Sequence, residues 1–166
     1  MATIDPRPLS PDRLATMLRA WSADLPASEA AVDLLVAHQI WLTRADFRTR
    51  LVDAVDDGWG PRGQVMPLAA IKWDDVETFL TTARTRASSS ELNMLRLAAS
   101  IAGTAAPISL MAMTASLDHT NAALVLDALA HRLHWHKHGF THTVTGHIAA
   151  PTDRAQPWPA ASATGS

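Results

Sequence analysis

The sequence predicts a mostly α-helical protein with a single domain, and three observations lead to this fold class. Apolar residues recur at helical spacing along most of the chain up to residue 136, in segments that open with capping residues. The length of 166 residues suits one hydrophobic core. No internal repeat and no second domain can be recognised. We therefore expect a helical bundle of six or seven helices over residues 1–148, followed by a flexible, disordered C-terminal tail over residues 149–166.

The first two helices are predicted from their start signals. Ser10 can cap the first helix, and Pro11 suits its first position, where a backbone N–H is not needed. Pro26 disfavours helical backbone at the residue before it, so the first helix should end near Asp24. Ser28 is expected to cap the second helix, whose apolar stripe follows at helical spacing: Val32, Leu35, Val36 and Ile40.

A break should separate the second helix from the third. Thr43 and Asp46 have the spacing of a capping box, which predicts a new helix start near Thr43. This third helix is expected to bury Phe47, Leu51, Val52 and Val55. Residues 56–63 include three glycines and a proline, so we expect a loop there. Residues 65–71 are compatible with a short strand or with the lead into a helix.

Two further helices and a short one are predicted in the middle of the chain. Apolar residues at helical spacing from residue 73 to residue 80 indicate a fourth helix that continues to about residue 84 or 86. Ser88 and Glu91 form a second capping box, and the fifth helix that begins there should stop at Gly103. Residues 109–115 suffice for about two helical turns.

The longest helix is expected over residues 120–136. Its apolar side chains, among them Ala122, Val125, Leu126, Leu129 and Leu133, surround it almost completely, which is typical of a helix in the centre of a bundle. We therefore expect this helix and the fifth one to form the spine of the fold. Residues 140–148 favour a small β-hairpin or an extended arm. Residues 149–166 are rich in proline and small residues without periodicity, which indicates the flexible tail.

The composition limits the functions that need consideration. The formal net charge is −2 and the pI is about 6.4, so the chain has no general attraction to nucleic acid or to an anionic membrane. No apolar run approaches the ~20 residues of a membrane helix. The chain has no cysteine, which excludes disulfides and cysteine-bound zinc. The first residues lack the pattern of a signal peptide, so we expect a cytoplasmic protein without a membrane partner.

The sequence matches no nucleotide-binding loop, nucleophile elbow or zinc-protease motif. We therefore expect a non-enzymatic protein without a cofactor that binds another protein or a second copy of itself. Trp59 in the predicted loop and Trp158 in the tail are candidate contact residues, because exposed tryptophan is common in interfaces. Arg44 and Arg48 lie one helical turn apart and complete this candidate set.

A second hypothesis is DNA binding. The predicted order after residue 90 is helix, short helix, long helix and β-arm, which resembles the order of parts in a winged helix-turn-helix regulator that uses residues 109–136. The candidate DNA-contacting residues are Thr120, Asn121, Arg132 and Lys137. The hypothesis is less favoured, because Asp118 would repel phosphates and the helix carries few basic residues.

A third hypothesis is metal binding near the end of the long helix. On a continuous helix, His131, His134 and His138 would share one face, a spacing suited to zinc or another divalent transition metal. In an extended segment, His134, His136 and His138 would instead point the same way and could also supply three nitrogen ligands. A simpler interpretation is that these histidines complement the negative end of the helix dipole, an effect of ~0.3–1 kcal/mol each. The sequence shows no acidic partner nearby that would orient metal-binding histidines.

Overall fold

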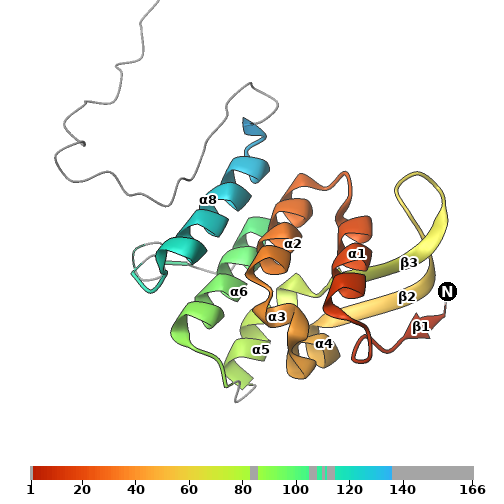
Figure 1. The fold of residues 1–166 in the computed structure, drawn as a ribbon, viewed down its shortest axis with the longest axis horizontal. Coiled ribbons are helices and arrows are strands. Elements are labelled where there is room, and N and C mark those ends of the chain that lie inside the picture. Colours follow the sequence, from red (N-terminus) through yellow and green to blue (C-terminus); the bar gives the residue numbers. More distant parts are fainter. Residues whose placement is uncertain (1, 83–85, 105–107, 110, 112–114, 136–166) are drawn as a thin grey trace, which may run out of the picture.

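A computed structural model describes residues 2–82, 86–104, 108–109, 111 and 115–135 of the chain. Over these residues the protein is mostly helical, as predicted, and it also contains a small three-stranded antiparallel sheet (Figure 1). In chain order the elements are β1 Thr3–Ile4, α1 Pro11–Ser22, α2 Pro26–His38, α3 Ile40–Thr43, α4 Ala45–Leu51, β2 Val52–Trp59, β3 Val65–Ile71, the 3-10 helix η1 Trp73–Asp75, α5 Val76–Thr82, α6 Ser89–Ala102 and α8 His119–Arg132. The sheet packs against α1. The described residues therefore form helices packed with a sheet and not a bundle of helices alone.

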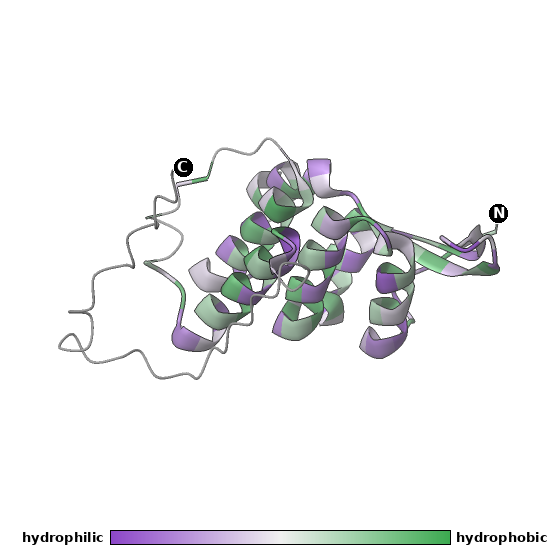
Figure 2. Cartoon of the chain, turned by 90° about the horizontal axis from the view of Figure 1, so that it is seen from above, coloured by the Kyte–Doolittle hydropathy of each residue, from purple (hydrophilic) through white to green (hydrophobic). Residues whose placement is uncertain are grey.

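The sheet corrects the prediction of a loop over residues 56–63. Strand β2 continues to Trp59 and pairs with β3, from Val52 opposite Ile71 to Trp59 opposite Val65, and β1 pairs along the other edge of β2. The ambiguity over residues 65–71 is resolved in favour of a strand. Gly58 lies inside β2 and is not a turn residue. A Cβ at this position would come within 2.5 Å of the Leu68 side chain, so glycine is needed for the close packing there. The hairpin projects from the helical body on the side of the N-terminus (Figure 2).

The first helix is confirmed at its start, whereas the predicted cap of the second is wrong. The Ser10 side chain accepts a hydrogen bond from the Arg13 backbone N–H at 3.2 Å, and Pro11 occupies the first helical position of α1. Helix α2 begins at Pro26, before Ser28, and no side chain caps it. The reason is that proline is itself suited to the first turn, so the helix starts two residues earlier than the serine signal indicates.

The break near Thr43 is confirmed, but the capping box is not formed. Arg44 has extended backbone between α3 and α4, and the Thr43 hydroxyl donates to the Ile40 carbonyl at 2.7 Å. The Asp46 carboxylate accepts instead from the Arg44 guanidinium and the Phe47 backbone N–H. Helix α4 then ends at Leu51, earlier than predicted, because Val52 and Val55 enter β2.

The centre of the core lies around α2 and α3. Helix α2 contacts α1 on one side and α6 and α8 on the other. Next to it, the fully buried Trp41 ring packs against Phe47 and Phe79, with ring centroids 5.8 Å and 6.2 Å away, and its Nε1 donates to the Glu91 carbonyl at 3.0 Å. The predicted spine of the fifth and the longest helix is therefore wrong, because α2 has the central place and α8 lies at the edge (Figure 1).

The ends of α6 confirm the sequence prediction. The Ser88 hydroxyl accepts from the Glu91 backbone N–H at 3.2 Å, and the Glu91 carboxylate accepts from the Ser88 backbone N–H at 2.8 Å, so both halves of the capping box are present. Gly103, with φ of 106°, ends the helix.

Helix α8 is shorter than predicted. It begins after Asp118, whose side chain accepts from the Asn121 backbone N–H at 2.7 Å, and it ends at Arg132 instead of residue 136. His134 has φ of 56°, which is incompatible with a continuing helix. Most of the short helix predicted over 109–115, the β-arm predicted over 140–148 and the tail lie outside the described residues.

Candidate functional site

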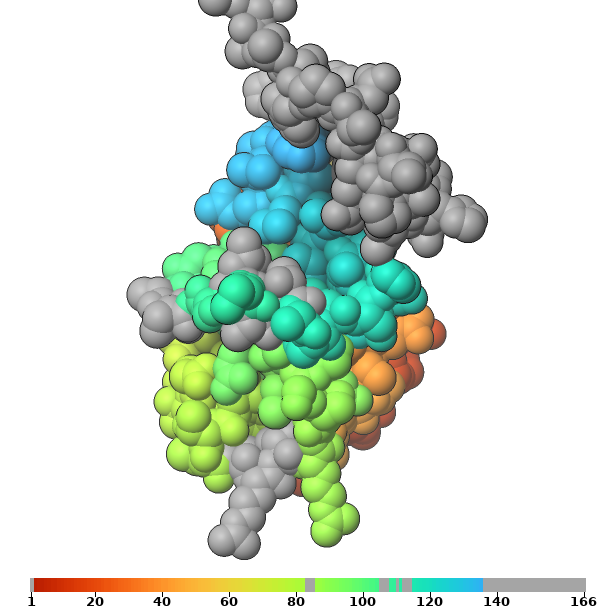
Figure 3. All heavy atoms as spheres, turned by 90° about the vertical axis from the view of Figure 1, so that its left-hand side faces the viewer, coloured from red at the N-terminus to blue at the C-terminus, as the bar shows by residue number. Residues whose placement is uncertain are grey.

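The most distinctive surface feature of the described residues is a row of leucines on the outer face of α8, formed by Leu126 and Leu129 of the helix and by its C-cap residue Leu133. Leu126, Leu129 and Leu133 are 54%, 38% and 56% exposed, and their spacing places them on one side of the helix. We call this row the α8 stripe. The sequence predicted these leucines to be buried, and that prediction is wrong, because α8 packs on α2 and α6 through its opposite face. Figure 3 shows α8, in cyan to blue, on the outer surface of the molecule.

Hydrogen bonds at both ends of α8 fix the direction in which the stripe points. At the start of α8, Asn121 Nδ2 donates to Ser90 Oγ of α6 at 3.2 Å. At its end, His131 Nε2 lies 3.3 Å from Glu29 Oε2 of α2. These contacts come from two different neighbouring helices, and together they orient α8 with its leucines on the outer side.

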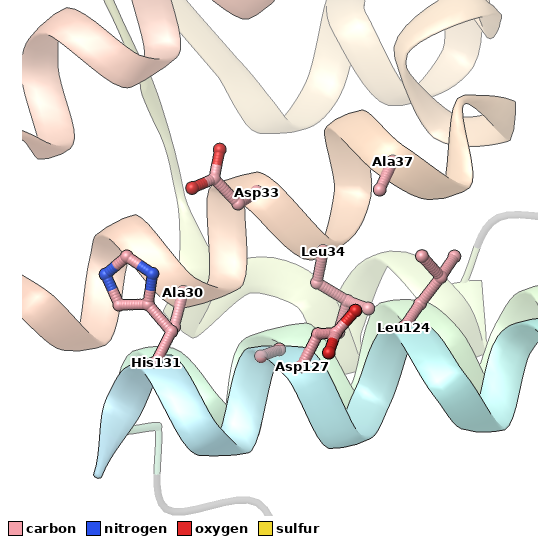
Figure 4. Close-up of a pocket in the computed structure, with 8 residues that line it drawn as sticks. Ala30, Asp33, Leu34, Ala37, Leu124, Asp127 and His131 are labelled. Carbon is pink, nitrogen blue, oxygen red and sulfur yellow. The ribbon is translucent and has the colours of Figure 1, made fainter. Parts of the chain in front are cut away.

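A groove of about 230 Å³ runs between α2 and α8, on the side of α8 away from the stripe. Figure 4 shows the side chains along the facing sides of the two helices; they are Ala30, Asp33, Leu34, Ala37, Leu124, Asp127, Ala128 and His131. Three alanines leave the space open. The Asp33 carboxylate forms an ion pair with Arg19 of α1 at 2.8 Å, so its charge is compensated within the protein. The groove contains no pair of nucleophile and base.

A second exposed apolar surface lies at the tip of the β2–β3 hairpin. Trp59 is 71% exposed and faces its cross-strand partner Val65, which is 60% exposed. The exposure of Trp59 agrees with its choice as a candidate contact residue, although it lies at the end of a strand. This tip and α8 are at opposite ends of the molecule (Figure 1). Trp158, the other candidate, lies outside the described residues.

The two candidate arginines are engaged within the protein. Arg44 forms an ion pair with Asp46 at 2.7 Å and donates to the Arg86 carbonyl at 2.9 Å; the hydrogen bond with Asp46 raises the pKa of Arg44 and lowers the pKa of Asp46. Arg48 is only 6% exposed, so its side chain is not on the surface, as a contact residue would have to be. Burial lowers the pKa of Arg48, whose guanidinium donates to the carbonyls of Arg7, Leu9 and Leu42. Arg48 therefore joins the N-terminal segment to the helices.

The candidate DNA-contacting residues that the structure describes, Thr120, Asn121 and Arg132, do not gather on one surface. Thr120 is exposed at the start of α8, whereas the Asn121 side chain is bonded to Ser90 and Asp118. Arg132 is at the other end of α8, about 18 Å from Thr120 along the helix axis. Lys137 lies outside the described residues. The arrangement thus offers no continuous basic face along the described part of α8.

The structure describes two of the three candidate metal ligands, His131 and His134, and they do not lie on one continuous helix as predicted. His131 is on α8 beside Glu29, but α8 ends before His134, and His138 lies outside the described residues. Within the described part of the chain, no three histidine or acidic side chains are close enough to hold a metal ion. Because α8 ends at Arg132 and His134 has φ of 56°, the continuous helical face predicted for these histidines does not extend to His134.

His38 is a residue that the sequence did not single out. It ends α2, and burial lowers the pKa of its imidazole, while the carboxylates of Glu91 and Asp118 oppose this shift. Its Nδ1 is buried and has no hydrogen-bond partner among the described residues. His38, Glu91 and Asp118 are far apart in sequence, and they interact because the end of α2 lies near the starts of α6 and α8. No local sequence pattern could therefore have indicated their interaction.

Comparison of the chain with protein-family models, curated proteins and solved structures finds no match. Among the helices that the structure describes, none combines the length and the apolar character needed to cross a membrane.

Proposed function

We propose that this protein is a non-enzymatic, protein-binding module and that the α8 stripe is its contact surface. The observation that carries the proposal is the exposure of three leucines in a row on a helix whose two ends are bonded to α6 and α2. A fixed apolar row is suited to recognition, because little conformational entropy is lost when a partner covers it.

The energetics support a modest but specific contact. Full burial of a leucine side chain contributes about 1.5–3 kcal/mol relative to full exposure. Because Leu126, Leu129 and Leu133 are each about half exposed, covering them would contribute roughly 1 kcal/mol each. A partner helix with its own apolar row is the natural complement, since helical rows interdigitate along their length.

The alternatives have less support. A DNA-binding surface needs unpaired basic groups, yet Arg44 is paired with Asp46 and Arg48 is buried. A metal site built from His131, His134 and His138 lacks the continuous helix on which its geometry depended. The α2–α8 groove offers carboxylates and an imidazole, but Asp33 and His131 are already in contact with Arg19 and Glu29.

Site-specific photo-crosslinking tests the proposal. Benzoylphenylalanine is introduced at position 126 of the stripe or, as a control, at Asp12, which is exposed on α1. In cells that make the protein, we expect position 126 to give a discrete crosslinked protein product, and position 12 to give none. Adding Leu129→Glu should abolish the product. The proposal fails if position 126 gives no product, or if Leu129→Glu leaves the product unchanged.

A further inference from the structure

We propose that the partner of the α8 stripe is a second copy of this chain, bound through an antiparallel pair of α8 helices. The proposal rests on the proposed function and adds the identity of the partner. The spacing of the stripe, its complementarity to itself and the charges at the two ends of α8 support it.

The spacing of the stripe is that of a helix–helix seam. Ala122, half-buried at the start of the same face, extends the row to Ala122, Leu126, Leu129 and Leu133, with steps of four, three and four residues. Alternating steps of three and four residues are those of the positions that face a neighbouring helix in a coiled coil. This face of α8 therefore has the pattern of a helix that packs against one more neighbour than the described elements supply.

The same row is complementary to itself when the second helix runs in the opposite direction. With the two-fold axis midway between positions 126 and 129, Leu126 lies opposite Leu129 of the second copy, and Ala122 lies opposite Leu133. A large side chain thus faces a small one at each end, and two leucine pairs fill the centre. The pairing places no charged side chain in the seam.

The charges of α8 also favour the antiparallel orientation. Asp118 precedes the helix, and Arg132 is exposed at its end. In an antiparallel pair, the acidic end of each helix approaches the basic end of the other, and the helix dipoles are opposed. In a parallel pair, Arg132 would lie near its own copy and the dipoles would repel.

The dimer should be weak, because one helix of 14 residues covers less than the roughly 800 Å² per partner of a standard stable interface. Sedimentation equilibrium of the purified chain, from about 10 μM to about 1 mM, should show a reversible monomer–dimer equilibrium. Leu126→Glu should weaken dimerisation by tenfold or more. Trp59→Ser, which removes an exposed apolar side chain at the hairpin tip, should leave it unchanged.

Two results would overturn the second-copy proposal. One is a monomer at every concentration. The other is an equal loss of dimer in Leu126→Glu and Trp59→Ser, which would indicate nonspecific association. Circular dichroism of both variants controls for folding, and because both positions are exposed, we expect wild-type spectra.

Disulfide trapping tests the orientation. The chain has no cysteine, so single variants Ala122→Cys and Leu133→Cys report only on the introduced thiols. An antiparallel pair should crosslink an equal mixture of the two variants into the heterodimer at least tenfold faster than either variant crosslinks alone. Faster crosslinking of each variant with itself would establish a parallel pair and overturn the proposed orientation.

The photo-crosslinking product separates this proposal from the more general one. A product with twice the chain mass of 17.9 kDa supports the second copy. A product of any other mass keeps the α8 stripe as a protein-binding surface but overturns self-association. Absence of a product from position 126 contradicts both proposals.

Discussion

Helices α6 and α8 have the same length and similar start signals but different surroundings. Each comprises 14 residues and begins with a side-chain cap, Ser88 in one and Asp118 in the other. Helix α6 contacts α2, α5, η1 and α8, and it buries Met94, Leu95, Leu97, Ala98, Ala99 and Ile101. Helix α8 contacts α2 and α6, and it buries Val125, Ala128 and Ala130. Helix formation was thus encoded locally in both, whereas burial depended on how many neighbours the fold supplies.

The difference also explains why α8 is the candidate contact element. A helix with apolar residues on most of its circumference is stable in water only when several neighbours cover it. In α8, Val125 and Ala128 are buried toward α2 and α6, and Ala130 is also buried, whereas Leu126, Leu129 and Leu133 are left exposed. Among the described residues, no element covers this side of α8, and the proposal assigns that place to another polypeptide chain.

The largest expected effect comes from truncating one leucine in each helix. Leu95→Ala in α6 removes a fully buried side chain and should lower the free energy of unfolding by about 2–5 kcal/mol. Leu126→Ala in α8 removes a half-exposed side chain and should cost less than about 1 kcal/mol. Urea unfolding at low protein concentration, where the chain is monomeric, measures both. Similar losses for the two variants would contradict the different burial of the helices.

A smaller effect is expected from the caps, and here the two helices should behave alike. Ser88→Ala and Asp118→Ala each remove a side-chain acceptor from a backbone N–H and should each lower the free energy of unfolding by about 1 kcal/mol. Asp118→Asn keeps an acceptor and should remain within about 0.5 kcal/mol of the wild type. The measurement is again urea unfolding. A loss of more than about 2 kcal/mol in only one helix would show that its cap has a tertiary role.

Much of the helical part of the fold could be predicted from local signals. The start of α1 at Pro11, the Ser88–Glu91 capping box and the end of α6 at Gly103 depend on neighbouring residues only, and all three are confirmed. The hairpin could not be predicted in this way. Gly58 resembles a turn residue in the sequence, and its actual role is set by Leu68, which is ten residues away and across the sheet.

The candidate site was less accessible to sequence reasoning for the same reason. The leucines of α8 were recognised as apolar and periodic, but the pattern does not reveal which side of a helix lacks a neighbour. Arg48 was chosen as a candidate contact residue from its helical spacing to Arg44, although its guanidinium donates to the carbonyls of residues 7, 9 and 42 inside the fold. Trp59 was correctly chosen as exposed because it lies beside glycines at the tip of a hairpin.

The smallest expected effect concerns His38, where the end of α2 faces the starts of both α6 and α8. Burial lowers the pKa of His38 below its usual 6.5, and the nearby Glu91 and Asp118 carboxylates only partly oppose this. Below pH 6.5 the unfolded chain therefore binds a proton that the folded chain still excludes. The free energy of unfolding should fall as the pH drops from 6.5 until His38 becomes protonated in the folded state. Above pH 6.5, His38 should contribute nothing to the pH dependence of the free energy of unfolding.

Replacing His38 with glutamine isolates this contribution. Urea unfolding of the wild type and of His38→Gln at pH 8, 7, 6 and 5 should give a constant difference in the free energy of unfolding at the two higher values, set by packing alone. Below pH 6.5 the wild type should lose more stability than the variant, because only the wild type carries the buried imidazole. If the wild type instead gained stability relative to the variant on acidification, Glu91 and Asp118 would outweigh burial, and the junction of α2 with α6 and α8 would be strengthened by protonation.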